Sequence, residues 1–248
     1  MCLIAFAWQV SDRPLLLLGN RDEFHPRPTR AATFWTEEGF PDVLAGKDLE
    51  AGGTWLGVTR QGRFAALTNI RSPGAQPGPR SRGQLVIDYL SGDMSPAEYL
   101  ARVAKDLDGY AGFNLLVGTP QQLFHLNSED GSANELQPGI YGLSNASLNS
   151  PWPKLTALCD GLEANLTSDS ATLLDLLKDS REYPDDQLPD SGVGLEWERL
   201  LSATFILGEK YGTRASTLLA IEADGSISFA ERSFGPDSTD QGELHWHF

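Results

Sequence analysis

The 248-residue sequence has few of the residues that metal centres and secreted disulfide frameworks need. It contains only two cysteines, Cys2 and Cys159, which lie far apart, and four scattered histidines. A zinc site needs clustered ligands, and a small secreted domain usually carries an even set of cysteines at framework spacing. We therefore expect no metal site, no bound cofactor and a reducing compartment.

Basic residues and long apolar runs are also scarce. Nineteen Lys plus Arg stand against 34 Asp plus Glu, which gives a net charge of -15. Such a charge repels phosphate backbones and anionic lipid surfaces, so nucleic acid is not an expected partner. No apolar run is long enough to span a bilayer, and residues 1–13 lack the basic and long apolar regions of a signal peptide. These features predict a cytoplasmic protein without a membrane span.

The residues that are present suit a globular protein with a substantial core. The chain is 40% hydrophobic and 9% aromatic, and its length fits one large domain over residues 1–248. Apolar runs between turn signals predict strands at 2–10, 15–19, 54–59, 63–70, 112–118, 122–126, 139–145, 203–207, 213–222 and 226–234. Helices are predicted at 85–90, 96–107, 152–166 and 171–177, and loops at 25–30, 71–83 and 181–194. Strands at both ends with helices between them are typical of an α+β protein.

Cys2 is a candidate nucleophile because it directly follows the initiator methionine. Methionine removal is expected before so small a side chain, and Cys2 would then carry both a thiol and a free α-amine. An amine with a pKa of about 8 can act as a general base at neutral pH, so one residue could supply nucleophile and base. The alternative is that Cys2 is simply a buried residue of the first strand, as free cysteine often is.

A polar cluster, Asn20-Arg21-Asp22-Glu23, follows the second predicted strand. In a hairpin the end of one strand lies beside the start of the other, so this cluster should lie close to Cys2. Asp22 could then hold the α-ammonium, and Arg21 could lower the pKa of the thiol. The alternative reading of the cluster is a solvated strand end.

A set of short motifs extends over nearly the whole chain. The motifs are Met1–Ile4, Gly19–Phe24 with Arg27–Pro28, Ala45–Asp48, Gly52–Gly57, Ala66–Asn69, Gly112–Leu115, Tyr141–Asn145, Pro151–Lys154 and Tyr211–Arg214. In this order they resemble the NRDE family, also called the transport and Golgi organisation family. The resemblance implies an N-terminal-nucleophile (Ntn) hydrolase-like fold, a four-layer α-β-β-α sandwich related to choloylglycine hydrolases and penicillin V acylases, which cut a linear amide.

The resemblance also implies roles for individual residues. Cys2 would be the nucleophile, Arg21 and Asp22 its attendants, Asn69 and Asn145 the oxyanion donors, and Arg214 a distal arginine of the site. Asn20 and Trp55 are assigned to substrate binding. Arg21 and Asp22 are adjacent, so in a regular strand they would point to opposite faces. Either the strand has ended there, or only one of the two reaches Cys2.

The other assigned residues have structural alternatives. Asn69 and Asn145 stand where predicted strands end, a position that suits oxyanion donors and also suits asparagines that cap a turn. Arg214 could form a buried structural pair with a carboxylate instead of serving catalysis. Trp55 could be a core residue instead of a pocket wall.

Two functions of different classes follow from the resemblance. The first is hydrolysis of a non-peptide carbon-nitrogen amide bond in a small molecule. The second is non-catalytic binding or trafficking of haem or an acyl lipid in the same pocket, since members of the family have been linked to haem movement and lipid homeostasis. The sequence has no Cys-x-x-Cys-His motif, and Cys2 or His25 would be the only local haem ligands. The sequence leaves both functions, and the oligomeric state, open.

Overall fold

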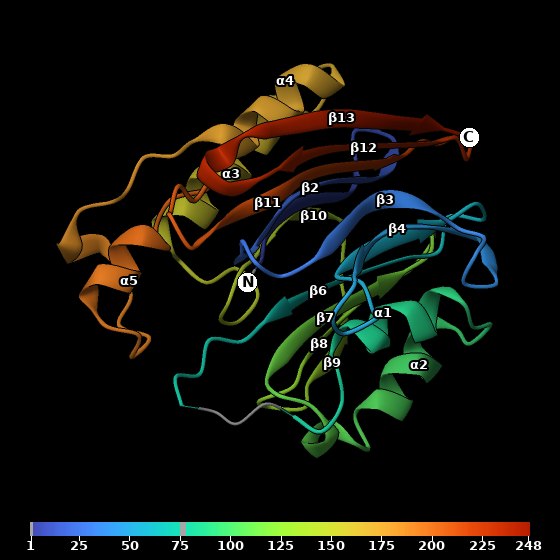
Figure 1. Cartoon of the computed structure of the whole chain (residues 1–248). Helices are drawn as coiled ribbons and strands as arrows, with labels where there is room; N and C mark the ends of the chain where they lie inside the picture. The colour runs from blue at the N-terminus through green and yellow to red at the C-terminus, as the bar shows by residue number, and fades with distance from the viewer. Residues whose placement is uncertain (1, 75–77) are drawn as a thin grey trace. The chain divides into compact units, whose positions relative to one another are not determined.

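The computed structural model describes residues 2–74 and 78–248, which form two compact units (Figure 1). The first unit consists of the chain up to Pro26, the short segment Arg71–Gly74, and Pro138–His247. The second consists of Arg27–Ile70, the described residues between Gly74 and Pro138, and Phe248. The expectation that residues 1–248 act as a single domain stays a prediction.

The first unit is built on a six-stranded antiparallel sheet in the order β10-β1-β2-β11-β12-β13. Its strands are β1 (Cys2–Val10), β2 (Arg13–Phe24), β10 (Gly139–Leu143), β11 (Tyr211–Ile221), β12 (Ile227–Phe234) and β13 (Asp240–His247). The apolar runs of β1 and β2 are buried on both faces, which is why these two strands lie inside the sheet rather than at its edge. The predicted hairpin between them is confirmed.

Helices cover one face of this sheet. They are α3 (Pro153–Ala164) and α4 (Ser170–Asp175), which is followed by the 3₁₀ turn η2 (Leu176–Lys178). The unit also contains α5 (Leu195–Leu200) and the 3₁₀ turns η3 (Asp185–Gln187) and η4 (Pro236–Ser238). The core on this face joins Leu155, Leu158 and Leu162 of α3 to Leu3, Ala5 and Ala7 of β1 and to Leu16 and Leu18 of β2. Because side chains alternate along a strand, Cys2 and Ile4 project from the opposite face.

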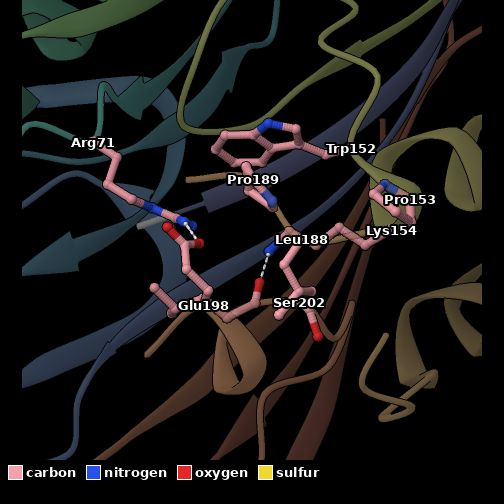
Figure 2. A pocket seen from close by; sticks show the side chains of 9 residues that line it. Arg71, Trp152, Pro153, Lys154, Leu188, Pro189, Glu198 and Ser202 are labelled. Atoms are coloured by element: carbon pink, nitrogen blue, oxygen red, sulfur yellow. Dashed lines mark hydrogen bonds and ion pairs between the residues drawn. The ribbon is translucent and has the colours of Figure 1, made fainter. Parts of the chain in front are cut away.

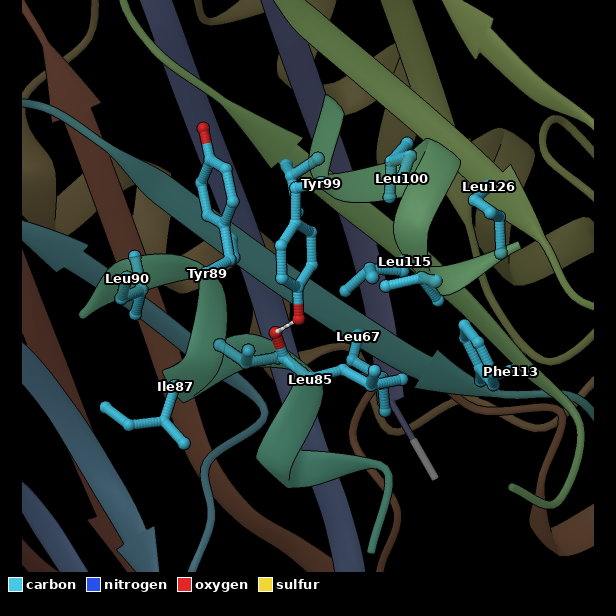
Figure 3. Packing of buried hydrophobic residues seen from close by; sticks show 14 of the residues in the cluster. Leu67, Leu85, Ile87, Tyr89, Leu90, Tyr99, Leu100, Phe113, Leu115 and Leu126 are labelled. Atoms are coloured by element: carbon cyan, nitrogen blue, oxygen red, sulfur yellow. Dashed lines mark hydrogen bonds between the residues drawn. The ribbon is translucent and has the colours of Figure 1, made fainter. Parts of the chain in front are cut away.

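The second unit contains a seven-stranded antiparallel sheet whose strands follow one another in sequence order. They are β3 (Thr29–Trp35), β4 (Phe40–Asp48), β5 (Leu56–Thr59), β6 (Phe64–Asn69), β7 (Phe113–Gly118), β8 (Leu123–Asn127) and β9 (Ala133–Glu135). The helices α1 (Gly83–Leu90) and α2 (Pro96–Val103) and the turn η1 (Leu107–Gly109) complete the unit. Figure 3 shows their packing, in which Tyr99 Oη donates a hydrogen bond of 2.6 Å to the carbonyl of Leu85.

Several predicted elements differ from the observed ones. The predicted strand at 203–207 is wrong, because this largely apolar segment, which is buried up to Ile206, has irregular backbone. The strands at 29–35, 40–48, 133–135 and 240–247 and the helix α5 were not predicted, and α2 ends at Val103 rather than Leu107. The predicted loop at 71–83 includes residues 75–77, which lie outside the described residues. Within the described ranges, no helix is long and apolar enough to cross a membrane.

Candidate active site

The candidate site lies at one end of the sheet in the first unit, where neighbouring antiparallel strands begin and end. Cys2 is the first residue of β1 and is paired with Arg21 of β2. The next residue of β2, Asp22, is paired with Thr213 of β11. The strand register therefore brings Cys2 close to the polar cluster, as the sequence predicted.

Arg21 and Asp22 point to opposite faces of the sheet. β2 continues to Phe24, so the strand has not ended at these residues. Directly opposed residues of an antiparallel pair share a face, which puts Arg21 on the face of Cys2 and Asp22 on the helix-covered face. Of the two alternatives that the sequence left open, the second describes this sheet: one of the two side chains shares the face of the thiol.

Burial governs the thiol of Cys2, whose residue is only 7% exposed. Desolvation raises the pKa of this thiol to about 11, and the negative charges of Asp22 and Glu23 act in the same direction, while Arg21 opposes them. A thiol with so high a pKa is protonated at neutral pH. Any attack by its sulfur therefore needs a base close by.

Asp22 is a buried carboxylate with a defined hydrogen-bond partner. Thr213 Oγ1 donates to Asp22 Oδ1 at 2.7 Å and itself accepts the backbone N–H of Ile206 at 2.9 Å. Burial raises the pKa of Asp22, whereas the positive charge of Lys154 and the hydrogen bond from Thr213 lower it. The charge of this carboxylate therefore depends on groups from α3 and β11.

The two predicted oxyanion donors belong to different units. Asn145 lies in the first unit, two residues beyond the end of β10, and its carbonyl accepts the backbone N–H of Arg71 at 2.8 Å. Continuing the antiparallel register of β1 and β10 by two residues would bring Asn145 level with Cys2. Asn69 lies in the second unit, as the last residue of β6 opposite Phe113. The roles assigned to both asparagines stay predictions.

Arg214 lies at an irregularity of β11, because the pairing with β2 shifts register between Thr213 and Ala215. Its guanidinium donates to the backbone carbonyls of Phe24 and His25, at 3.1 and 3.0 Å, and to that of Phe234 at 3.2 Å. These contacts fix the end of β2 just beyond the polar cluster. Its catalytic role stays a prediction.

The two residues assigned to substrate binding are both buried. Asn20 donates from Nδ2 to the carbonyls of Leu177 and Thr204, at 2.9 and 2.8 Å, and Ser216 donates to its Oδ1 at 2.6 Å. These bonds tie β2 to the helical layer of its own unit. Trp55 lies in the second unit and is 9% exposed. Contact of either residue with a substrate stays a prediction.

Sequence reasoning missed Lys154 as a residue of the site. Lys154 is 4% exposed, and its Nζ donates to the carbonyl of Leu201 at 2.6 Å and approaches that of Ala203 at 3.5 Å. Burial lowers its pKa to about 8, against the raising effect of the negative charge of Asp22. A signal was present in the sequence, because Lys154 stands four residues before Leu158, in the phase of the apolar stripe of α3.

A second missed feature is the buried ion pair of Arg71 and Glu198, whose side chains are 4% and 5% exposed. Arg71 Nη1 lies 2.7 Å from Glu198 Oε2, and the guanidinium stacks over the ring of Trp152 at 4.8 Å. Together with Lys154 these residues line a small pocket of about 10 Å³, which is about the space of one water molecule (Figure 2). Arg71 Nε is buried there without a hydrogen-bond partner.

Exposed aromatic side chains lie at the end of β2, where Phe24 directly follows the acidic residues Asp22 and Glu23. Phe24 is 51% exposed and Trp197 is 39% exposed, and both pack edge-on against the buried ring of Tyr211, with centroids 5.1 and 5.7 Å away. Burial raises the pKa of Tyr211, and the charges of Asp22 and Glu23 raise it further. An apolar surface therefore adjoins the charged end of the sheet.

Within residues 2–74 and 78–248, no group of three or more His, Cys, Asp or Glu side chains is arranged to hold an ion. The titratable groups gathered at this end of the sheet are the thiol of Cys2, the carboxyl groups and the basic side chains described above.

Sequence comparison links the chain to a family of proteins named for transport and Golgi organisation. The family model described as "Transport and Golgi organisation 2" matches residues 1–236. The human homologue is 36% identical, over 99% of this chain and 96% of its own length. The bovine homologue is also 36% identical, over 96% and 95%, and the Drosophila melanogaster protein is 28% identical, over 94% and 92%.

Two solved structures resemble this one in fold. An N-acylethanolamine-hydrolyzing acid amidase orthologue from Caenorhabditis elegans superposes with a TM-score of 0.53 at 12% identity, over 88% of this chain and 92% of its own. The C2A mutant of a conjugated bile acid hydrolase from Clostridium perfringens gives 0.53 at 7% identity, over 98% and 92%. These likenesses confirm the predicted α+β fold of the Ntn-hydrolase type.

Proposed function

Because the chain belongs to the transport and Golgi organisation 2 family and shares its fold with two amide hydrolases, we propose that it is a cysteine amidohydrolase of the N-terminal-nucleophile type. Its substrate would be a small molecule with a non-peptide carbon-nitrogen amide bond. The observation that carries the proposal is the pairing of Cys2 with Arg21 at the head of β1, with Asp22 as the next residue.

The proposed reaction begins with removal of Met1, a residue outside the described ranges, which frees the α-amine of Cys2. The amine takes the thiol proton, and the sulfur attacks the amide carbonyl to give a tetrahedral oxyanion. Asn145 and Asn69 are the proposed donors to that oxyanion. The α-ammonium then protonates the departing amine, and the C–N bond breaks to leave a thioester. Water, deprotonated by the free α-amine, hydrolyses the thioester and restores the thiol.

The α-amine suits the role of base because Cys2 is otherwise a poor nucleophile. Its pKa of about 11 leaves a negligible thiolate fraction at neutral pH. An amine on the same residue has a pKa of about 8 before the protein perturbs it, and it needs no conformational change to reach the sulfur. The buried carboxylate of Asp22 would stabilise the ammonium that forms when the proton moves.

The test combines intact mass with cysteine variants. We expect the purified protein to lack Met1 and to hydrolyse at least one member of a panel of N-acylethanolamines and conjugated bile acids. Cys2→Ala should lower that rate by about 10³-fold or more, whereas Cys159→Ala, which removes the other cysteine, should leave it unchanged. Retention of Met1 in active protein, or full activity of Cys2→Ala, would contradict the proposal.

A second candidate function, non-catalytic binding of haem or an acyl lipid, is favoured by the exposed aromatic side chains of Phe24 and Trp197. Exposed aromatic surface beside a buried polar site is typical of a place where an apolar ligand binds. Haem should give a Soret shift, and an acyl-CoA should raise the melting temperature, with both effects reduced in Phe24→Ser and Trp197→Ser. The absence of both responses would exclude this function.

A further inference from the structure

The helix α5 buries a charged side chain and exposes apolar ones. Glu198 is its one buried residue, at 4% exposed, whereas Leu195 and Trp197 are 49% and 39% exposed. A surface helix ordinarily packs through an apolar stripe and turns its charges to water. A helix of six residues is also too short to be stable by itself. The contacts of Glu198 are therefore central to how α5 is held on the protein.

Both carboxylate oxygens of Glu198 accept hydrogen bonds (Figure 2). Arg71 Nη1 donates to Oε2 at 2.7 Å, while the backbone N–H and the hydroxyl of Ser191 donate to Oε1 at 2.8 and 2.5 Å. Arg71 Nη1 also donates to Ser191 Oγ at 3.1 Å, and the guanidinium stacks over the ring of Trp152. All four residues belong to the first unit. The side chain of Arg71 is thus fixed by α5, by the loop before α5 and by the residue before α3.

The backbone of Arg71 extends this network to the proposed oxyanion donor Asn145. The Arg71 N–H donates to the carbonyl of Asn145 at 2.8 Å. Neither residue lies in a strand or a helix, since β10 ends at Leu143, so sheet pairing does not fix their positions. Printed contacts therefore run without a break from Glu198 to the Arg71 side chain, and from the Arg71 backbone to Asn145.

We propose that Glu198 is a positioning residue, which acts through Arg71 to fix the backbone of Asn145. Its bearing on catalysis rests on the proposed amidohydrolase function, in which Asn145 donates to the tetrahedral oxyanion. Such a donor has to lie about 2.7–3.1 Å from the oxygen that develops the charge, so a small displacement of its backbone weakens the interaction. The helix α5 then serves as a brace for the oxyanion donor.

A purely structural role for Glu198 is the competing explanation, because loss of a buried charge can loosen a whole unit. Glu198→Gln keeps the shape of the side chain and removes its charge. Ser191→Ala removes one hydroxyl from the network and is the milder variant if Glu198→Gln does not fold. Asp185→Asn is the matched control, because it breaks the exposed pair with Arg199 on the same helix and leaves Glu198 in place.

The first experiment measures the hydrogen bond between Arg71 and Asn145 without any substrate. Exchange of the Arg71 backbone amide with deuterium is followed by NMR. The backbone amide of Asn149 is the reference, because it donates to the carbonyl of Gly142 at 2.7 Å in the same loop as Asn145 but does not depend on Arg71. General loosening of the fold would accelerate exchange at both amides equally.

The expected changes are confined to the Arg71 amide. It should exchange about 10-fold faster or more in Glu198→Gln and about 3-fold faster in Ser191→Ala, while the Asn149 amide changes less than about 2-fold. Asp185→Asn should alter neither amide. Equal acceleration of both amides in Glu198→Gln and Ser191→Ala, or an unchanged Arg71 amide, overturns the proposal.

The second experiment connects the network to the reaction. Per folded protein, Glu198→Gln should lower kcat about 10-fold and leave KM within about 2-fold, because an oxyanion donor acts on the transition state. The same substitution should have little further effect in Asn145→Ala, and equal losses in both backgrounds would overturn the link to Asn145. Absence of hydrolysis in the parent would contradict the proposed function and leave the amide exchange measurable, so the two proposals fail separately.

Discussion

The two sheets of the molecule bury polar groups of different kinds. The first unit buries charged side chains: Arg21, Asp22, Lys154 and Glu198 are each less than a tenth exposed. The second unit has a comparable buried polar chain in which His125 Nε2 lies 3.1 Å from Asn114 Oδ1, and Asn114 Nδ2 donates to Thr68 Oγ1 at 3.2 Å. Burial lowers the pKa of His125 to about 4, so this chain is neutral near pH 7.

The two kinds of buried polar group differ in their effect on stability: neutral hydrogen-bonded groups stabilise the fold, whereas buried charges tend to destabilise it. A neutral buried hydrogen bond stabilises a protein by about 1 kcal/mol, whereas a buried charge costs several kcal/mol unless it is well paired. The second unit connects its strands with neutral groups alone along this chain. Charges concentrated at one end of the first sheet are therefore the more informative sign of chemistry, and that end carries Cys2.

The strongest test of this contrast is removal of one buried charge. Glu198→Gln keeps the shape of the side chain but leaves Arg71 without its counter-ion, near Lys154, and we expect a loss of about 3–5 kcal/mol of unfolding free energy. Asp185→Asn is the matched control, because it breaks the exposed pair with Arg199 at 2.6 Å and should cost less than about 1 kcal/mol. Chemical denaturation measures the loss of unfolding free energy in both variants. Equal losses would show that the buried ion pair is no more important for stability than the exposed one.

The pH dependence of stability tests the neutral chain of the second unit. The folded-state pKa of His125, about 4, lies below its ordinary value of 6.5, so the unfolded state binds a proton first as pH falls. The stability that neutral His125 contributes is complete above pH 6.5 and is lost as pH falls toward 4, by up to about 3 kcal/mol. The unfolding free energy, measured by chemical denaturation at a series of pH values across this range, should depend less on pH in His125→Gln than in the parent. The same slope in parent and variant would mean that His125 titrates freely in the folded protein.

The smallest expected effect concerns a single hydrogen bond in the core of the second unit. Tyr99→Phe removes the Oη that donates to the Leu85 carbonyl at 2.6 Å, and should cost about 1 kcal/mol. Hydrolysis, measured below the melting temperature, should not change. A loss of activity that exceeds the loss of folded protein would show that this core hydrogen bond also supports the reaction.

The sequence predicted the fold best where pattern and packing agree. The apolar runs of β1 and β2 and the turn between them predicted a hairpin, and the register then placed Cys2 opposite Arg21. The segment at 203–207 was predicted as a strand because it is apolar. Its backbone groups instead bond to scattered partners. Lys154 approaches the carbonyl of Ala203, Thr213 accepts the N–H of Ile206, and the N–H of Phe205 bonds to the carbonyl of Asp179. Hydrophobicity indicated burial there but not which partner would satisfy the backbone.

The site was predicted only in part, for the same physical reason. Cys2, Arg21 and Asp22 are joined by a local hairpin, which a short sequence pattern can reveal. Lys154 and Glu198 owe their importance to contacts with residues distant in the chain, and a lone lysine or glutamate in a helix is ordinarily a solvent-exposed residue. Only the lysine left a trace, as a charged residue within an apolar helical stripe.

The interleaving of the two units bears on how the protein is made. Asp22 and Thr213 bond across 191 residues of chain, with all of the second unit except Phe248 encoded between them. Contacts between residues so far apart in the sequence form late in folding. The second unit, in contrast, pairs neighbouring strands in order and can fold as its residues leave the ribosome. The β1–β2 hairpin therefore lacks its neighbouring strand until β11 has been made, and the environment of Cys2 is completed only when most of the chain has been synthesised.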